Sequence, residues 1–313
     1  MREHQLIADG STVVVGFSGG PDSTFLLYLL AGWREQMGIT IIAAHLDHGW
    51  RPESAQEVEW CRRVAQNLGV TFVAGRLADF ASGLKETGSR EDMGRRGRRL
   101  FLQKVAREHG AASIALAHHR DDQRETFFIR LLRGASLSGL ACMKPRDGLY
   151  VRPLLDIGKD EILAYLHEHE ITYLHDPSNE SREFLRNRVR HGVIPVLRAC
   201  DDRFDRNCDA TLGRLQEAEE LMEQLTRERY AAITHVNGDG VQVIDCKQLC
   251  AQSPAMQRRL MLHWLCGVGV PFDPSQALLD EILRFLSSPR GGTHQVHSDW
   301  TITKRAGRAS ICS

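Results

Sequence analysis

The sequence predicts an α/β protein: a parallel, doubly wound sheet followed by a smaller, mostly helical C-terminal domain. Two observations predict this. Short apolar segments rich in β-branched residues alternate with helix-length segments through the first half of the 313-residue chain, as in sheets that helices cover on both faces. Polar, glycine-containing motifs follow three of these apolar segments, and ligands bind at the carboxyl ends of strands in such sheets.

Four strands and four helices are expected before residue 150. The strands occupy 12–17, 40–46, 70–73 and 113–117, and the helices occupy 22–36, 53–68, 89–109 and 121–133. Segments such as TVVVGF and TIIAAHL are almost continuously apolar, which indicates strands that are buried on both faces. Their alternation with helices makes a parallel sheet the expected arrangement.

The pattern changes after about residue 150. Helices are expected over 159–169, 182–199 and 206–235, and then near 254–266 and 275–287. The Asn-Gly-Asp-Gly sequence at 237–240 is a strong turn signal, and short strands accompany the last helices. The predicted domains are therefore 1–205 and 206–313, the second made of a long connecting helix and a small α+β domain.

Composition limits the classes of function. The 40 Lys and Arg balance the 40 Asp and Glu, so nucleic-acid binding would depend on local basic patches. No apolar run is long enough for a membrane span and the first residues lack signal-peptide features, so a cytoplasmic protein without a membrane partner is expected. The 8 cysteines form no CxxC pair, which favours free thiols over a structural metal site.

The first motif lies between the strand at 12–17 and the next helix. It consists of Ser18, Gly19, Gly20, Pro21, Asp22 and Ser23. Glycines let the backbone approach a ligand closely, and the N–H groups of a helix start attract anions. A carboxylate beside phosphates indicates a Mg²⁺ bridge, while the absence of a lysine favours chemistry at the α-phosphate of ATP. A capped strand–turn–helix without a ligand is the structural alternative.

Two further motifs follow later strands. One is HLDHGWR at 45–51, which contains His45 and His48, and the other is HHRDDQRET at 118–126. Asp122 and Glu125 are three residues apart and share one face of a helix, so with His118 they suit a cationic amine or Mg²⁺. The structural alternatives are a polar strand end and an acidic first helical turn that complements the dipole.

Two segments are locally basic, 90–107 and 179–200. In the second, Arg186 and Arg190 are one helical turn apart and form a face suited to phosphate contacts. A solvated helix face is the alternative for such a segment taken alone.

SGGxDS after a first strand resembles the signature of the N-type ATP pyrophosphatases, whose members adenylate a carbonyl oxygen before a nucleophile displaces AMP. That superfamily contains amide-forming synthetases, tRNA thiolases and the tRNA(Ile)-lysidine synthetases. The later motifs resemble the lysidine synthetases: HxDHGxR, AHHxDDQxET, LLRG with GLxxM at 131–143, RPLL at 152–155, DxSN at 176–179 and RNRxR at 186–190. The resemblance is strong over 12–200 and weaker over 206–313, as in a short form of the family.

This resemblance implies roles for individual residues. The nucleotide is expected at Ser18, Gly19, Gly20, Pro21, Asp22, Ser23, His45, His48 and Arg95, and the catalytic residues are expected to be Asp22, His118, Asp122 and Glu125. Asp122 and Glu125 would hold the substrate lysine, and Asp22 would hold Mg²⁺ through ATP. The tRNA contacts are expected at Arg133, Arg152, Asn179, Arg186, Asn187, Arg188 and Arg190. Three positions depart from the family pattern. Arg99 stands where tyrosine is usual, Ala135 where serine or threonine is common, and Cys142 where glycine is usual.

The activity implied is ATP-dependent ligation of free lysine to C2 of the wobble cytidine of tRNA(Ile) with a CAU anticodon, through an adenylated cytidine. Residues 1–205 would be the catalytic domain with an anticodon-contacting segment, and a homodimer is an expected assembly. The alternatives are a tRNA thiolase, an amide-forming synthetase of small metabolites and a non-catalytic RNA-binding module. The missing CxxC pair argues against the first, and the arginines at 186–190 argue against the second.

Overall fold

The structure is a computed structural model that describes residues 6–50, 54–83, 90–175, 184–238, 240–272 and 274–312. The chain divides into two compact units, Met1–Leu215 and Gln216–Ser313. The boundary between them lies within the helix α9 (Phe204–Ile233), later in the chain than the 205/206 boundary expected from the sequence.

A six-stranded sheet with the order β3-β2-β1-β4-β6-β5 forms the centre of the first unit. Its strands are β1 (Thr12–Gly16), β2 (Thr40–Asp47), β3 (Thr71–Arg76), β4 (Ser113–Ala115), β5 (Arg146–Asp147) and β6 (Tyr150–Val151). Every neighbouring pair is parallel except β5 with β6. The parallel sheet predicted from the sequence is therefore confirmed, and the two shortest strands extend it at one edge.

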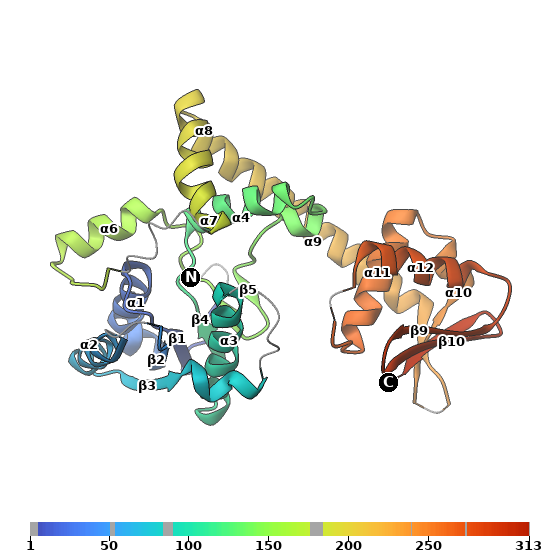
Figure 1. The fold of residues 1–313 in the computed structure, drawn as a ribbon, viewed down its shortest axis with the longest axis horizontal. Helices are drawn as coiled ribbons and strands as arrows, with labels where there is room; N and C mark the ends of the chain where they lie inside the picture. The colour runs from blue at the N-terminus through green and yellow to red at the C-terminus, as the bar shows by residue number, and fades with distance from the viewer. Residues whose placement is uncertain are drawn as a thin grey trace. The chain divides into compact units, whose positions relative to one another are not determined.

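The helices of this unit alternate with the strands (Figure 1). They are α1 (Pro21–Met37), α2 (Ser54–Asn67), η1 (Leu77–Gly83), α3 (Arg90–Glu108), α4 (Arg120–Leu132), α5 (Leu137–Leu140), α6 (Lys159–Glu168), α7 (Leu185–Arg188), η3 (Val189–Val193) and α8 (Ile194–Cys200). The four helices expected before residue 150 correspond to α1, α2, α3 and α4, and each begins and ends within one residue of its predicted bounds.

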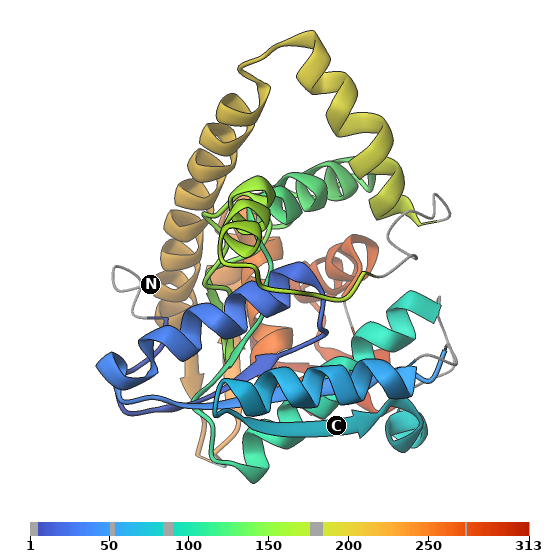
Figure 2. The ribbon, with the colours of Figure 1, turned by 90° about the vertical axis from the view of Figure 1, so that its left-hand side faces the viewer.

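Alternate residues of the central strands supply two different cores. Val13 and Val15 of β1 join a core with α1, α2 and α6, whereas Val14 packs in a second core with α3. Figure 2 shows α1 and α2 side by side over the first of these faces. Because successive side chains of a strand point to opposite faces, an uninterrupted apolar strand requires this double cover.

The order of the strands creates a switch point beside β1. The chain adds β2 and β3 on one side of β1 and returns through α3 to place β4 on the other side. The loops that leave β1 and β4 therefore diverge, and such a crevice at the carboxyl ends of parallel strands is where α/β sheets bind ligands. The turn 18–23 and the motif 118–126 follow these two strands.

The helix predicted over 182–199 is not regular in its described part. A π-helical turn, η3, separates α7 from α8. Pro195 in the first turn of α8 has no N–H to donate to the residue four positions earlier, so the ladder of hydrogen bonds shifts at this point. Arg190 lies within the π-helical turn.

The second unit contains a five-stranded sheet with the order β7-β8-β11-β10-β9, whose neighbours are antiparallel. Its elements are β7 (Thr234–Val236), β8 (Gln242–Asp245), α10 (Cys246–Cys250), α11 (Pro254–Gly267), α12 (Gln276–Ser287), β9 (Gly292–His297), β10 (Trp300–Arg305) and β11 (Arg308–Cys312). The core surrounds Trp264 of α11, which is fully buried. The smaller C-terminal domain is thus confirmed, with a more extensive sheet than "mostly helical" implies.

Buried polar contacts also join elements of the second unit. Arg259 of α11 makes a two-pronged ion pair with Glu219 of α9, with nitrogen–oxygen distances of 2.7 and 2.9 Å. Ser253 and Ser275 cap α11 and α12 by accepting hydrogen bonds from Met256 N and Leu278 N. Across the described ranges, no helix is both long and apolar enough to cross a membrane.

Candidate active site

The turn after β1 is held in a fixed shape by its own hydroxyl groups. Ser23 Oγ donates to Gly20 O at 3.0 Å, accepts from Ser18 N at 3.2 Å and lies 3.0 Å from Ser18 Oγ. Gly19 has a φ of +84°, and a Cβ there would lie 2.6 Å from Leu174 Cδ1, so both backbone angle and space require glycine. Gly20 is the N-cap of α1 and no described side chain caps this helix, which is the arrangement of a helix start that binds anions.

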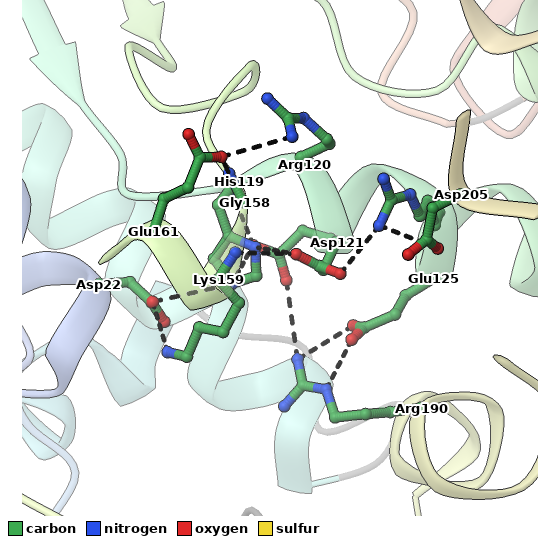
Figure 3. Close-up of polar contacts among 12 residues, drawn as sticks. Asp22, His119, Arg120, Asp121, Glu125, Gly158, Lys159, Glu161, Arg190 and Asp205 are labelled. Atoms are coloured by element: carbon green, nitrogen blue, oxygen red, sulfur yellow. Dashed lines mark hydrogen bonds and ion pairs between the residues drawn. The ribbon is translucent and has the colours of Figure 1, made fainter. Parts of the chain in front are cut away.

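Asp22 stands in the first turn of α1 between two groups from other parts of the chain (Figure 3). Lys159 Nζ lies 2.5 Å from Asp22 Oδ1, and His119 Nε2 lies 3.7 Å from the same oxygen. The side chains of Asp22 and Lys159 are each 30% exposed. The carboxylate is therefore held in place but remains accessible to a ligand.

His119 joins this turn to α4, of which it is the N-cap. Its backbone N–H donates to Asp122 Oδ2 at 3.0 Å, and its Nε2 lies 3.6 Å from the same oxygen. Burial opposes ionisation of Asp122, but the nearby His119, Arg186 and His118 hold the pKa of this carboxyl below its usual value. Asp122 is thus a buried, ionised carboxylate at the carboxyl end of β4.

Glu125 follows one turn later on α4, is 2% exposed and is paired with two arginines. Arg190 Nε and Nη2 donate to its two carboxylate oxygens at 2.5 and 3.1 Å, and Arg186 Nε lies 3.1 Å from Oε2. Arg190 also lies 3.8 Å from Asp122 Oδ1. The arginines expected to contact tRNA phosphates therefore point towards the carboxylates expected to hold lysine, as Figure 3 shows for Arg190.

A second ion-pair network surrounds Arg124 of α4. Arg124 makes hydrogen bonds of 2.8 and 2.6 Å to the two oxygens of Asp209, and it also pairs with Asp121 and Asp205 at 3.1 Å. The other oxygen of Asp121 accepts the backbone N–H of Lys159 at 2.9 Å. These contacts join the N-terminal parts of α4, α6 and α9, and Arg124 is almost fully buried among them.

The motif after β2 contacts the strand end that precedes the turn 18–23. His45 is buried and its Nδ1 lies 2.9 Å from Phe17 O. It therefore supports the strand end that leads into the turn 18–23, which we call the phosphate turn. Burial holds the pKa of His45 below its usual value. His48 stacks on Trp50 with ring centroids 4.6 Å apart, and Arg98 Nη2 lies 3.1 Å from His48 Nε2.

The other residues predicted to bind the nucleotide or tRNA differ in how exposed they are. Arg95 is 81% exposed at its side chain and pairs with Asp92 at 3.3 Å. Arg133 and Arg188 are exposed, Asn187 is buried, and Arg152 donates to Lys144 O at 2.7 Å. Asn179 lies outside the described residues.

His118 precedes the N-cap of α4 and is partly exposed at the surface, although its ring lies largely away from water. Burial, with smaller contributions from Arg152 and other cations, lowers the pKa of His118 from 6.5 to about 4, although Asp122 opposes the shift. The ring is therefore uncharged at neutral pH, and its low pKa makes it a weak base there.

This pKa predicts an acid-sensitive fold. Unfolded His118 binds a proton below pH 6.5 and folded His118 only below about pH 4, so stability falls as the pH decreases through this window. We expect His118 to cost about 2 kcal/mol of unfolding free energy between pH 6.5 and 4. Urea unfolding across this range checks it, and His118→Gln should have a shallower pH dependence. An equally steep dependence in that variant would contradict the assignment.

The three departures from the family pattern have local explanations. Cys142 keeps a φ of +61°, the left-handed conformation that glycine adopts most easily, and Arg130 Nη1 donates to its carbonyl oxygen at 3.1 Å. A Cβ on Gly139 would lie 2.6 Å from Ala135 Cβ, so the small residue at 135 suits a tight loop. The guanidinium of Arg99 lies over the Tyr150 ring, 4.8 Å from its centroid.

Sequence reasoning did not single out Lys159, His119 and Arg98. Lys159 is the first residue of a helix remote in sequence from the phosphate turn, and only the fold brings the two together. His119 is adjacent to the predicted His118, and the N-cap position before Arg120 was the available signal. Arg98 lies in the same basic segment as Arg95 but faces His48.

The donors around Asp22 suit Mg²⁺ that arrives with a nucleotide. This ion takes one or two protein carboxylates and completes its coordination with phosphate oxygens and water. Asp22 is such a carboxylate, partly exposed next to the phosphate turn. Within the described ranges no group of three or more His, Cys, Asp or Glu side chains is arranged to hold a metal ion. Asp22 would thus hold Mg²⁺, which would supply neutralisation of phosphate charge.

Comparison with known proteins identifies the family. Residues 2–197 match the model of the PP-loop domain, and residues 244–309 match the TilS substrate binding domain. The tRNA(Ile)-lysidine synthase of Bradyrhizobium sp. is 34% identical over 306 residues, which cover 91% of this chain and 84% of that protein. The chain belongs to the tRNA(Ile)-lysidine synthase family.

Other members of the tRNA(Ile)-lysidine synthase family are longer. The protein of Geobacter sulfurreducens is 36% identical over 261 residues, 82% of this chain and 55% of that protein. The protein of Bacillus thuringiensis is 31% identical over 294 residues, 91% of this chain and 62% of that protein. The chain therefore spans less than two thirds of the length of these two relatives.

A solved structure shows the same fold outside the lysidine synthase family. The U34-tRNA thiolase NcsA from Methanococcus maripaludis, with its [4Fe-4S] cluster, superposes with a TM-score of 0.58 at 21% identity. The match covers 68% of this chain and 74% of the thiolase. The likeness concerns the architecture of the PP-loop domain and supports the assignment of the fold.

Proposed function

We propose that this protein joins free lysine to C2 of the wobble cytidine of a tRNA(Ile) with a CAU anticodon, with release of AMP and pyrophosphate. The observation that carries the proposal is the convergence of a phosphate turn, the carboxylates Asp22, Asp122 and Glu125, and His118 and His119 at one switch point, in a chain of the lysidine synthase family. These are the groups that an ATP-dependent ligation to a cationic amine requires.

Two chemical steps make up this reaction. Cytidine O2 attacks the α-phosphorus of ATP, the bond to the β-phosphate breaks, and pyrophosphate leaves. The ε-amine of lysine then attacks C2, and AMP departs with the oxygen. The phosphate turn and the N-terminus of α1 bind and orient the triphosphate in this scheme, and the target base leaves its stack to reach them.

The carboxylates of α4 bind the amino acid. Asp122 and Glu125 share one face of α4, and the Glu125 carboxylate already accepts hydrogen bonds from Arg190 and forms an ion pair with Arg186. An ammonium group of lysine is a donor of the same charge, so it competes with these arginines for the same oxygens. The arginines released in this exchange are then available for tRNA phosphates. Lysine binding by the carboxylates and tRNA binding by the arginines are therefore compatible.

The attacking amine must lose a proton, because the pKa of a free lysine amine is about 10.4. A carboxylate partner stabilises the ammonium form and so opposes this loss. The proposal therefore places the α-amino group, rather than the ε-amine, on Asp122 and Glu125, or requires the ε-amine to change partner before attack. The proton passes to a base at the site or to the leaving phosphate. His118 is uncharged but only a weak base for this transfer, because burial lowers its pKa to about 4.

The test is direct incorporation of lysine into RNA. The protein is incubated with radiolabelled lysine, Mg²⁺, ATP and a tRNA(Ile) transcript bearing CAU, and label in the RNA is counted. Label transfer that requires ATP is the expected result. A transcript whose wobble cytidine is replaced by uridine should remain unlabelled, and equal labelling of an unrelated tRNA would refute the assigned substrate.

The same assay separates the alternatives. A tRNA thiolase would transfer sulfur from a persulfide donor and leave lysine unincorporated. An amide-forming synthetase would consume ATP and its amine substrate without RNA. An RNA-binding module would bind the transcript with an affinity indifferent to ATP and lysine. The membership of the chain in the lysidine synthase family favours the ligase over all three.

A further inference from the structure

A lysine lies beside the phosphate turn although the turn itself contains none. Lys159, the first residue of α6, places Nζ 2.5 Å from Asp22 Oδ1. Residues 18–23 are SGGPDS, so any ammonium group for the phosphates of a nucleotide must come from elsewhere in the fold. Figure 3 shows the Lys159 side chain extended towards Asp22.

Several contacts fix the start of α6 in this place. The backbone N–H of Lys159 donates to Asp121 Oδ2 at 2.9 Å, and Arg120 N donates to Ile157 O at 2.9 Å. The Glu161 carboxylate accepts the Gly158 N–H at 2.7 Å and pairs with Arg120 at 3.4 Å. These bonds tie the segment to the first turn of α4, so Lys159 is directed at the phosphate turn by the backbone and not by its side chain alone.

The Asp22–Lys159 pair has the properties of exchangeable partners. Both side chains are 30% exposed, so neither is sealed in the core and a ligand is able to reach them. A partly exposed ion pair of this kind contributes little to stability. The position beside a fixed anion-binding turn therefore points to a role in binding rather than in folding.

We infer that Lys159 is a catalytic residue that binds the β- and γ-phosphates of ATP and stabilises pyrophosphate as it leaves. The inference rests on the proposed function and extends it. Asp22 would hold the Mg²⁺ ion that accompanies ATP, and Lys159, which lies beside Asp22 at the same turn, would then have the phosphates as further anionic partners. A compact ammonium with three donors suits such a group.

The role of Lys159 in the first chemical step is electrostatic. The bond between the α-phosphorus and the bridging oxygen breaks, and pyrophosphate keeps the electron pair and carries additional negative charge. The Lys159 side chain donates hydrogen bonds to the departing oxygens. It takes no part in the second step, because pyrophosphate has already been released.

Equilibrium binding of two nucleotides tests this role without any turnover. The full-length protein, Mg²⁺ and the tRNA transcript are titrated with α,β-methylene ATP, whose α–β linkage is not cleaved, and separately with AMP. For Lys159→Met we expect binding of the ATP analogue to weaken by about 10–100-fold while binding of AMP is unchanged. Lys159→Arg keeps the charge and should retain most of the affinity for the analogue.

A matched control is available on α3. Lys104 is exposed, pairs with Glu108 at 3.9 Å and lies in the same unit, so Lys104→Met removes an equal charge away from the turn. Its affinities for both nucleotides should equal those of the wild type. The melting temperature of each variant shows whether the fold is retained.

The outcomes separate this inference from the proposed function. Equal weakening of both nucleotides in Lys159→Met, or no weakening of either, would overturn the role of Lys159 while leaving the proposed ligase intact. A wild-type protein that binds neither nucleotide would overturn both. Selective loss of the ATP analogue, with AMP unchanged, supports the assignment.

Discussion

Replacing Asp22 by alanine is expected to reduce lysine transfer to tRNA by about a thousandfold. The carboxylate lies at the turn 18–23, where it contacts Lys159 and His119, and in the proposed function it would hold Mg²⁺ with ATP. Its loss removes that ligand and leaves Lys159 without its partner. Because the Asp22 side chain is 30% exposed, the fold should be retained. The measurement is radiolabelled lysine incorporated into the tRNA(Ile) transcript per unit time.

Two variants make this experiment specific. Asp22→Asn keeps the size of the side chain and removes its charge, so it should be nearly as inactive as alanine if the charge matters. Asp160→Ala removes an exposed first-turn carboxylate from α6 and should have wild-type activity. An Asp22→Ala protein that keeps more than about a tenth of the wild-type rate would contradict the role, since a single electrostatic contact is worth more than that.

Replacing Glu125 by glutamine is expected to weaken both the fold and the binding of lysine. Glu125 is 2% exposed and is the carboxylate closest to Arg190 and Arg186, so the substitution removes the nearest counter-charge of both guanidinium groups and leaves the longer contact of Arg190 with Asp122. We expect a loss of about 2–3 kcal/mol of unfolding free energy. The KM for lysine should rise by about tenfold or more, because one charged partner of the amine is lost.

Urea unfolding and lysine kinetics measure these two effects separately. Glu108→Gln removes the carboxylate of an exposed surface pair with Lys104, and its stability should change by less than about 0.5 kcal/mol. If Glu125→Gln were as stable as the wild type, the pairing with the two arginines would be energetically unimportant. If its KM for lysine were unchanged, Glu125 would not contact the amino acid.

Local sequence patterns predicted the elements of the first unit well. The uninterrupted apolar runs of β1 and β2 and the helices between the strands follow from residue type alone, because burial on both faces leaves no place for polar side chains. The helix over 182–199 was only partly predictable, since the π-helical turn depends on Pro195 and on the contacts of Arg190 with Glu125. The two-residue strands β5 and β6 are too short to leave a pattern.

The candidate site also contains some features that local sequence predicts and others that depend on the fold. The phosphate turn and the Asp122–Glu125 spacing are local, so the sequence shows them directly. The position of Lys159 depends on α6 being tied to the first turn of α4, 38 residues from its partner Asp121. The arginines Arg186 and Arg190 share a helix-like spacing, but only the fold reveals that this face meets Glu125. Contacts between remote segments follow from packing, which residue spacing alone does not encode.

The division of the chain inside α9 has a practical consequence for anyone who wishes to study one half alone. In most multidomain chains the domain boundary falls in an exposed, flexible linker, where truncation leaves both domains folded. Here a cut after Leu215 would pass through a continuous helix. The carbonyl groups in the last turn of the shortened helix would lose the N–H groups that donate to them. A fragment intended to carry the PP-loop alone would therefore end in a frayed helix, close to Asp205 and Asp209, which brace Arg124.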